Sequence, residues 1–209
     1  MQRRPLAVCL RWARPALAAW VMHPGSRPTL NALCVNACLL SNADTAVAAR
    51  SQKPGDRAGL QPANTGHLTV LADSGPFVAL YNNKDEYHQR ALDFFRVHGA
   101  ALRLHTTWEV ISEVMYFLDF SAQVQADFLE WLYAGHQQGL VTIAAFEAAE
   151  LPGIATMMRK YADRPMDLAD ASLVWLANKL DVTDIITVDR ADFAVYRTEK
   201  RRAFRNLFS

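Results

Sequence analysis

Cysteine is nearly absent from this 209-residue chain. Its three cysteines, Cys9, Cys34 and Cys38, lie in the first third, and residues 67–209 contain none. A segment of that length buries enough apolar surface to fold without disulfide bridges, which fits a reducing, intracellular setting and predicts a cytoplasmic protein. Cys34 and Cys38 have helical spacing but no nearby His or Cys pair, which argues against a zinc site there.

Long apolar runs are also absent. The sequence has no run of about 18 or more apolar residues, the length that a membrane-spanning helix needs. Its composition is otherwise that of an ordinary globular protein, with 51% hydrophobic and 21% charged residues. We therefore expect no membrane partner.

Acidic residues are missing before Asp44, and this absence divides the chain. Residues 1–66 hold eight basic and two acidic residues, a net charge of +6, whereas residues 67–209 hold 14 basic and 19 acidic residues, a net charge of −5. We predict a basic, disordered leader or start-site extension over 1–66 and one folded domain over 67–209. A basic, acid-poor leader is also typical of organelle transit peptides. The plainer hypothesis is that the working protein begins near Leu68 or Val70.

Short apolar runs alternate with amphipathic segments from His67 onward. The runs typical of buried strands are 68–72, 101–106, 140–146 and 184–189. The segments with helical spacing of apolar residues are 85–98, 108–120, 121–135, 148–161 and the stretch after Pro165. This alternation predicts a three-layer α/β/α sandwich around a central, mainly parallel sheet. Residues 73–76, Asp-Ser-Gly-Pro, predict a turn after the first strand.

Carboxylates occupy positions that packing alone does not require. Asp73 and Asp189 end two strands, Glu113 interrupts an apolar helix, and Asp167 and Asp170 open another helix. Each has a simpler interpretation on its own: Asp167 as a helix cap worth about 1 kcal/mol, Asp170 as a favourable charge in a first turn, Asp73 and Asp189 as turn residues, Glu113 as a solvated side chain. However, proteins with parallel sheets bind their ligands beyond the carboxyl ends of the strands, and Asp73 and Asp189 both lie at such ends.

Several carboxylates in one cleft repel one another unless a cation is present. Oxygen ligands without Cys or His partners suit Mg²⁺ or Mn²⁺ rather than zinc. A metal held by acids keeps bound water, which can be activated for attack on a phosphodiester. The set therefore predicts metal-dependent phosphodiester hydrolysis.

Four segments in this order resemble the motifs of PIN-domain nucleases, particularly the VapC-type toxin ribonucleases of toxin-antitoxin pairs. They are LADSGPFVALY (71–81), TTWEVISEV (106–114), PMDLADASLVWLA (165–177) and ITVDRADF (186–193). The resemblance covers about residue 68 to the C-terminus and implies a PIN-like fold and an endoribonuclease. The leader is the one obvious departure from the family pattern.

The resemblance also implies roles for individual residues. The metal ligands and catalytic residues it implies are Asp73, Glu113, Asp170 and Asp189. Asp167 becomes an auxiliary or second-metal candidate, and the hydroxyls of Ser74 and Thr187 are expected to orient neighbouring carboxylates or a metal-bound water. Both hydroxyls can instead be satisfied by the local backbone.

The implied partners are an RNA substrate, single-stranded RNA or a tRNA loop, together with a cognate antitoxin and a second copy in a homodimer. A basic tail, Arg197 to Arg205, either binds phosphates or carries solvated charge. Aromatic residues on 108–117 and 128–133 either form core or mark a partner surface. Two alternatives stay open: a PIN-like RNA-processing nuclease without an antitoxin, and a non-enzymatic interaction module in which the acids are caps and turns.

Overall fold

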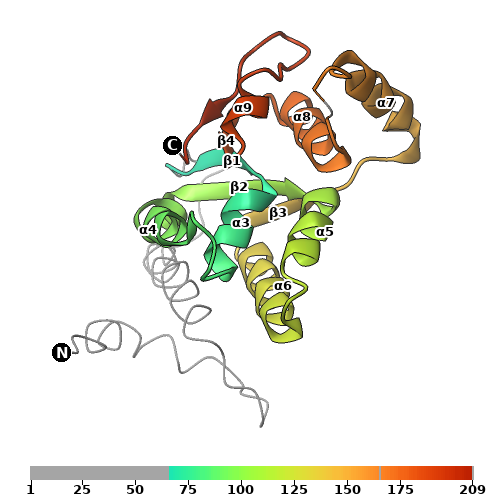
Figure 1. Ribbon diagram of the computed structural model, residues 1–209. Coiled ribbons are helices and arrows are strands. Elements are labelled where there is room, and N and C mark those ends of the chain that lie inside the picture. Colours follow the sequence, from blue (N-terminus) through green and yellow to red (C-terminus); the bar gives the residue numbers. More distant parts are fainter. Residues whose placement is uncertain (1–65, 165, 209) are drawn as a thin grey trace, which may run out of the picture.

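The computed structural model describes residues 66–164 and 166–208, which form a parallel sheet covered by helices (Figure 1). The sheet has five strands in the order β3-β2-β1-β4-β5, and every paired strand is parallel to its neighbours. The strands are β1 (Leu68–Ala72), β2 (Leu102–Thr107), β3 (Val141–Ala144), β4 (Asp184–Ile186) and β5 (Arg205–Asn206). The predicted leader and the hypotheses about it lie outside the described residues, apart from Gly66.

Helices cover both faces of the sheet, so the predicted three-layer α/β/α sandwich is confirmed (Figure 1). One layer contains α3 (Ser74–Tyr81), α4 (His88–His98), α5 (Trp108–Phe117) and α6 (Ala122–Gln137). The other contains α7 (Leu151–Lys160), α8 (Leu168–Leu180) and α9 (Arg190–Phe193). Short 3₁₀ turns, η3 (Gly99–Ala101) and η4 (Ala148–Glu150), precede β2 and α7. Within the described residues, no helix has both the length and the apolar character needed to cross a bilayer.

β1 is the central strand and separates two hydrophobic cores. Val70 and Ala72 pack into the core that contains Phe77 and Trp131, whereas Leu71 faces the core built by α8 and Tyr196. This division follows from the two-residue period of a strand, which sends successive side chains to opposite faces. Because both faces are covered, the buried part of the strand, Val70 to Ala72, is entirely apolar.

The order of the strands reverses at β1, because β2 lies on one side of it and β4 on the other. In open parallel sheets, ligands bind in the crevice beyond the carboxyl ends of the strands at such a reversal. The fold therefore places the ends of β1 and β4 side by side at the position where a site is expected.

The predicted turn over residues 73–76 is wrong, because these residues begin helix α3. Asp73 has extended backbone angles and its side chain accepts a hydrogen bond from the Ser74 N–H, as an N-cap does. Gly75 and Pro76 occupy the first helical turn, where a proline lacks only a hydrogen bond that the helix would not make. Asp serves equally as a turn residue and as a cap, so the local sequence does not distinguish the two.

Candidate active site

Asp73 and Asp189 lie on adjacent strand ends. Asp73 directly follows β1, and its N–H donates to the carbonyl oxygen of Ile186, the last residue of β4, at 3.1 Å. Asp189 follows β4 by three residues and precedes α9. Parallel pairing of β1 with β4 thus brings together two acids that are separated by more than half the domain in sequence.

Three of the five candidate carboxylates cap helices. Asp73 caps α3, Asp167 accepts from the Asp170 N–H at 2.8 Å as the cap of α8, and Asp189 accepts from the Asp192 N–H at 3.0 Å as the cap of α9. The predicted capping role of Asp167 is confirmed. These bonds satisfy N–H groups that have no partner inside the helix. Capping therefore accounts for the positions of three acids without any ligand.

Thr187 connects the two strand-end acids. Its hydroxyl donates to Oδ2 of Asp73 at 2.6 Å and accepts from the Asp189 N–H at 2.8 Å, and the residue is fully buried. With the Ser74 N–H on its other oxygen, the Asp73 carboxylate has a partner on each oxygen. Against the effect of burial, the Ser74 side chain in turn lowers the pKa of Glu113. The orienting contact expected of Thr187 is thus present as a hydrogen bond to Asp73, whereas the role expected of the Ser74 hydroxyl stays a prediction.

Gly75 allows this close approach between strand ends. A Cβ atom at this position would collide with the Val188 side chain, which lies between Thr187 and Asp189. Any larger residue would push the start of α3 away from the loop after β4. The glycine of the first motif is therefore explained by packing against the loop that carries Asp189.

Electrostatic repulsion links all five acids. Burial, together with the charges of Glu113 and Asp167, raises the pKa of Asp73 to about 6. Burial, followed by the charges of Asp167, Asp73 and Asp189, raises the pKa of Asp170 to about 8. The pKa of Glu113 is raised by burial and by Asp167. Neighbouring negative charges disfavour ionisation of each other, so these side chains form one carboxylate cluster.

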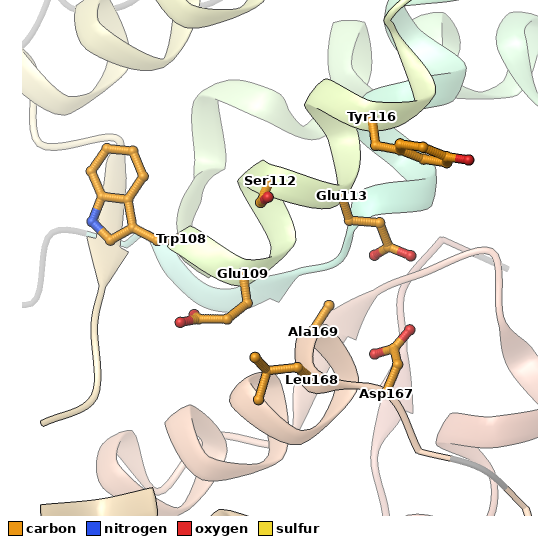
Figure 2. Close-up of a pocket in the computed structure, with 8 residues that line it drawn as sticks. All are labelled: Trp108, Glu109, Ser112, Glu113, Tyr116, Asp167, Leu168 and Ala169. Atoms are coloured by element: carbon orange, nitrogen blue, oxygen red, sulfur yellow. The ribbon is translucent and has the colours of Figure 1, made fainter. Parts of the chain in front are cut away.

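A cleft of about 530 Å³ opens beside the carboxylate cluster, between α5 and the start of α8. Figure 2 shows Glu113 and Asp167 on facing sides of this cleft with their carboxylates directed toward each other. Two aromatic side chains on α5, Trp108 and Tyr116, also line it and are 54% and 73% exposed. On α6, Phe128 and Trp131 are buried core, whereas Tyr133 is 66% exposed, so core and exposed aromatic residues occur together on that helix.

The donor chemistry of the cluster fits a hard divalent cation, because every side chain offers carboxylate oxygens and none offers sulfur or imidazole nitrogen. Within residues 66–164 and 166–208, however, no three His, Cys, Asp or Glu side chains are arranged as they would be around a metal ion. The metal-ligand assignment stays a prediction.

Tyr196 is a member of the site that the sequence did not indicate. Its hydroxyl donates to Oδ2 of Asp170 at 3.0 Å from the segment that follows α9. Nothing in the spacing of the motif marks this residue, because the contact depends on how α9 packs against α8. The nearest motif residue is Phe193, which precedes Tyr196 by three residues and contacts its ring.

Three cations of the basic tail, Lys200, Arg202 and Arg205, pair with acids away from the carboxylate cluster. Arg205 pairs with Asp184 through two contacts of 2.7 and 2.5 Å, and Lys200 and Arg202 both pair with Asp181. Asp184 begins β4, so these pairs lie at the amino end of the strands, opposite to Asp189. These three cations therefore neutralise local acids rather than line the cleft.

No protein-family model matches this sequence, and no curated protein matches it either. The functional interpretation therefore depends on the chemistry of the site and on the motif resemblance.

Proposed function

We propose that this chain is a cytoplasmic, metal-dependent endoribonuclease of the PIN-like type. The observation that carries the proposal is the gathering of five carboxylates at the carboxyl edge of a parallel sheet, where burial and the neighbouring negative charges raise the pKa values of Asp73, Glu113 and Asp170. Strongly perturbed acids in a cleft are typical of functional sites. Repulsion of this kind is unfavourable for the fold alone and is relieved by a cation.

Asp73, Glu113, Asp170 and Asp189 are the residues that would hold Mg²⁺ or Mn²⁺, with Asp167 as an auxiliary ligand. When bound, the ion supplies an activated water and offsets the negative charge that develops during phosphodiester hydrolysis. The chain itself orients the acids. Thr187 fixes Asp73 relative to Asp189, because its hydroxyl donates to the Asp73 carboxylate and accepts from the Asp189 N–H.

Single-stranded RNA is the substrate class that the cleft supports best. Tyr116 exposes its ring near Glu113, and Trp108 exposes its ring at the other end of the cleft, beyond Glu109 (Figure 2). Exposed aromatic rings stack on unpaired bases. Each stacked base typically contributes about 1–3 kcal/mol, a useful amount where the net charge of the domain repels phosphates.

A role as the toxin of a type II toxin-antitoxin pair is supported by the motif resemblance. The residues that line the cleft include Glu109, Glu113 and Asp167 and no Lys or Arg, so a basic side chain of an antitoxin fits its charge. Such a side chain would compete with the metal.

The same resemblance supports a homodimer. Induced expression in a bacterial host is expected to arrest growth, and Asp170→Asn is expected to relieve the arrest.

The direct test is cleavage of single-stranded RNA by the full chain in Mg²⁺, in Mn²⁺ and with a chelator. Cleavage in either metal, absent with chelator and absent in Asp170→Asn, supports the proposal. Cleavage that persists with chelator, or that Asp170→Asn retains, refutes it.

A second candidate is a non-enzymatic interaction module. It is favoured by the capping bonds of Asp73, Asp167 and Asp189, which give three acids a structural role. Calorimetric titration with Mn²⁺ separates the two candidates, because an interaction module gives no saturable heat.

A further inference from the structure

Tyr196 is fully buried, and its hydroxyl reaches a carboxylate of the cluster. The hydroxyl donates to Oδ2 of Asp170 at 3.0 Å, across 26 residues of sequence and between different elements. A buried tyrosine hydroxyl needs a hydrogen-bond partner. The partner of Tyr196 is Asp170, a half-buried acid that the neighbouring carboxylates repel. The pair therefore joins the hydrophobic core to the carboxylate cluster.

The tyrosine ring is held rigidly in place. Its ring centroid lies 5.0 Å from that of Tyr161 and 5.4 Å from that of Phe193, both in edge-to-face geometry. A phenol hydroxyl is protonated at neutral pH, so Tyr196 is a hydrogen-bond donor to Asp170. A fixed donor of this kind limits rotation of the carboxylate that accepts from it.

Asp170 needs such a constraint more than its neighbours do. The carboxylates of Asp73, Asp167 and Asp189 each accept a hydrogen bond from a backbone N–H at a helix start. The Asp170 carboxylate accepts one from the Tyr196 hydroxyl instead. The negative charges of Asp167, Asp73 and Asp189 repel the Asp170 carboxylate. Without the Tyr196 hydroxyl, we expect the Asp170 side chain to rotate toward water. With Oδ2 engaged, Oδ1 is left as the oxygen available to a cation.

We propose that Tyr196 is a positioning residue that holds Asp170 in the orientation used for metal binding. This inference rests on the proposed function. Groups that hydrogen-bond to metal ligands typically change metal affinity or activity about 10- to 100-fold when removed. The contribution comes from orientation, because the phenol itself remains bound to Asp170 and away from the ion.

The test is Mn²⁺ binding by calorimetry for the wild type, Tyr196→Phe and Tyr161→Phe. Tyr196→Phe keeps the packed ring and removes only the hydroxyl, and we expect its Mn²⁺ dissociation constant to rise by about tenfold or more. Tyr161→Phe is the matched control. The Tyr161 ring contacts the Tyr196 ring edge to face, but the Tyr161 hydroxyl accepts from the Arg197 N–H rather than bonding to an acid of the cluster. We expect the control to bind Mn²⁺ as the wild type does.

A second comparison separates positioning from a general loss of stability. In an Asp170→Asn background, removal of the Tyr196 hydroxyl should cause no further change in residual Mn²⁺ affinity, because its target carboxylate is already gone. An equal loss in both backgrounds overturns the proposal, as does wild-type affinity in Tyr196→Phe. If the wild type itself shows no saturable Mn²⁺ heat, the proposed function fails and this inference fails with it.

Discussion

Replacement of Asp170 by Asn tests the physical basis of the site without any substrate. The substitution removes one negative charge from the carboxylate cluster and keeps the size of the side chain. The amide oxygen can still accept from the Tyr196 hydroxyl, so the packing of α8 against the segment after α9 is preserved. In chelator, we expect Asp170→Asn to be more stable than the wild type.

The size and the pH dependence of this effect follow from the pKa of Asp170. In the folded chain the pKa rises from 3.8 to about 8, so between these values the folded state holds a proton that the unfolded state has released. The free energy of unfolding of the wild type therefore falls as pH rises through this window. Four pKa units correspond to about 5–6 kcal/mol as an upper limit. Asp170 is partly exposed, so solvent screening reduces the expected gain to roughly 1–3 kcal/mol.

The assay is urea unfolding in chelator at about pH 5 and about pH 9, where the advantage of Asp170→Asn should be small and large respectively. Asp181→Asn is the control with the opposite sign. Lys200 and Arg202 lower the pKa of Asp181, so removal of its charge should lower stability or leave it unchanged at the higher pH. If Asp170→Asn is less stable than the wild type at the higher pH, or its advantage does not change with pH, the repulsion argument is refuted.

Three further substitutions test the neighbouring contacts. Gly75→Ala should destabilise the fold by roughly 1–3 kcal/mol through its clash with Val188, and an unchanged melting temperature would contradict the close packing. Thr187→Val should lower the free energy of unfolding by roughly 1.5–3 kcal/mol at neutral pH and impair RNA cleavage; a Thr187→Ser variant should restore both. Arg205→Ala should leave RNA affinity, measured by fluorescence anisotropy, unchanged because Arg205 pairs with Asp184 at the opposite end of the sheet.

The fold was predictable because its strands are buried on both faces. Such strands read as short apolar runs, and their alternation with amphipathic segments left a parallel sandwich as the simplest arrangement. Helix α3 was missed for the same reason, since most of its residues are buried and its sequence lacks an amphipathic period. Strand β5 is two residues long and carries Arg205, so its pairing with β4 depends on tertiary contacts that no local pattern records.

The positions of the acids were predictable, but their interactions were not. Strand ends and helix starts can be read from sequence, so the placement of Asp73 and Asp189 at one edge of the sheet follows from the topology. That Thr187 bonds to one acid and to the backbone of the other depends on the distance between β1 and β4. The contact of Tyr196 with Asp170 depends on helix packing and has no counterpart in the motifs.

Capping and metal binding make compatible demands on a carboxylate. A cap uses one oxygen for a backbone N–H and leaves the second oxygen for another partner, as Asp167 and Asp189 each do at the start of a helix. The positive end of a helix also favours negative charge nearby, which partly offsets repulsion within the cluster. Asp170 lies in the first turn of α8 and accepts from the Tyr196 hydroxyl, whereas Glu113 lies in the middle of α5, away from a helix start. Repulsion is therefore least compensated at Glu113, and a cation that binds the cluster should offset it most at that position.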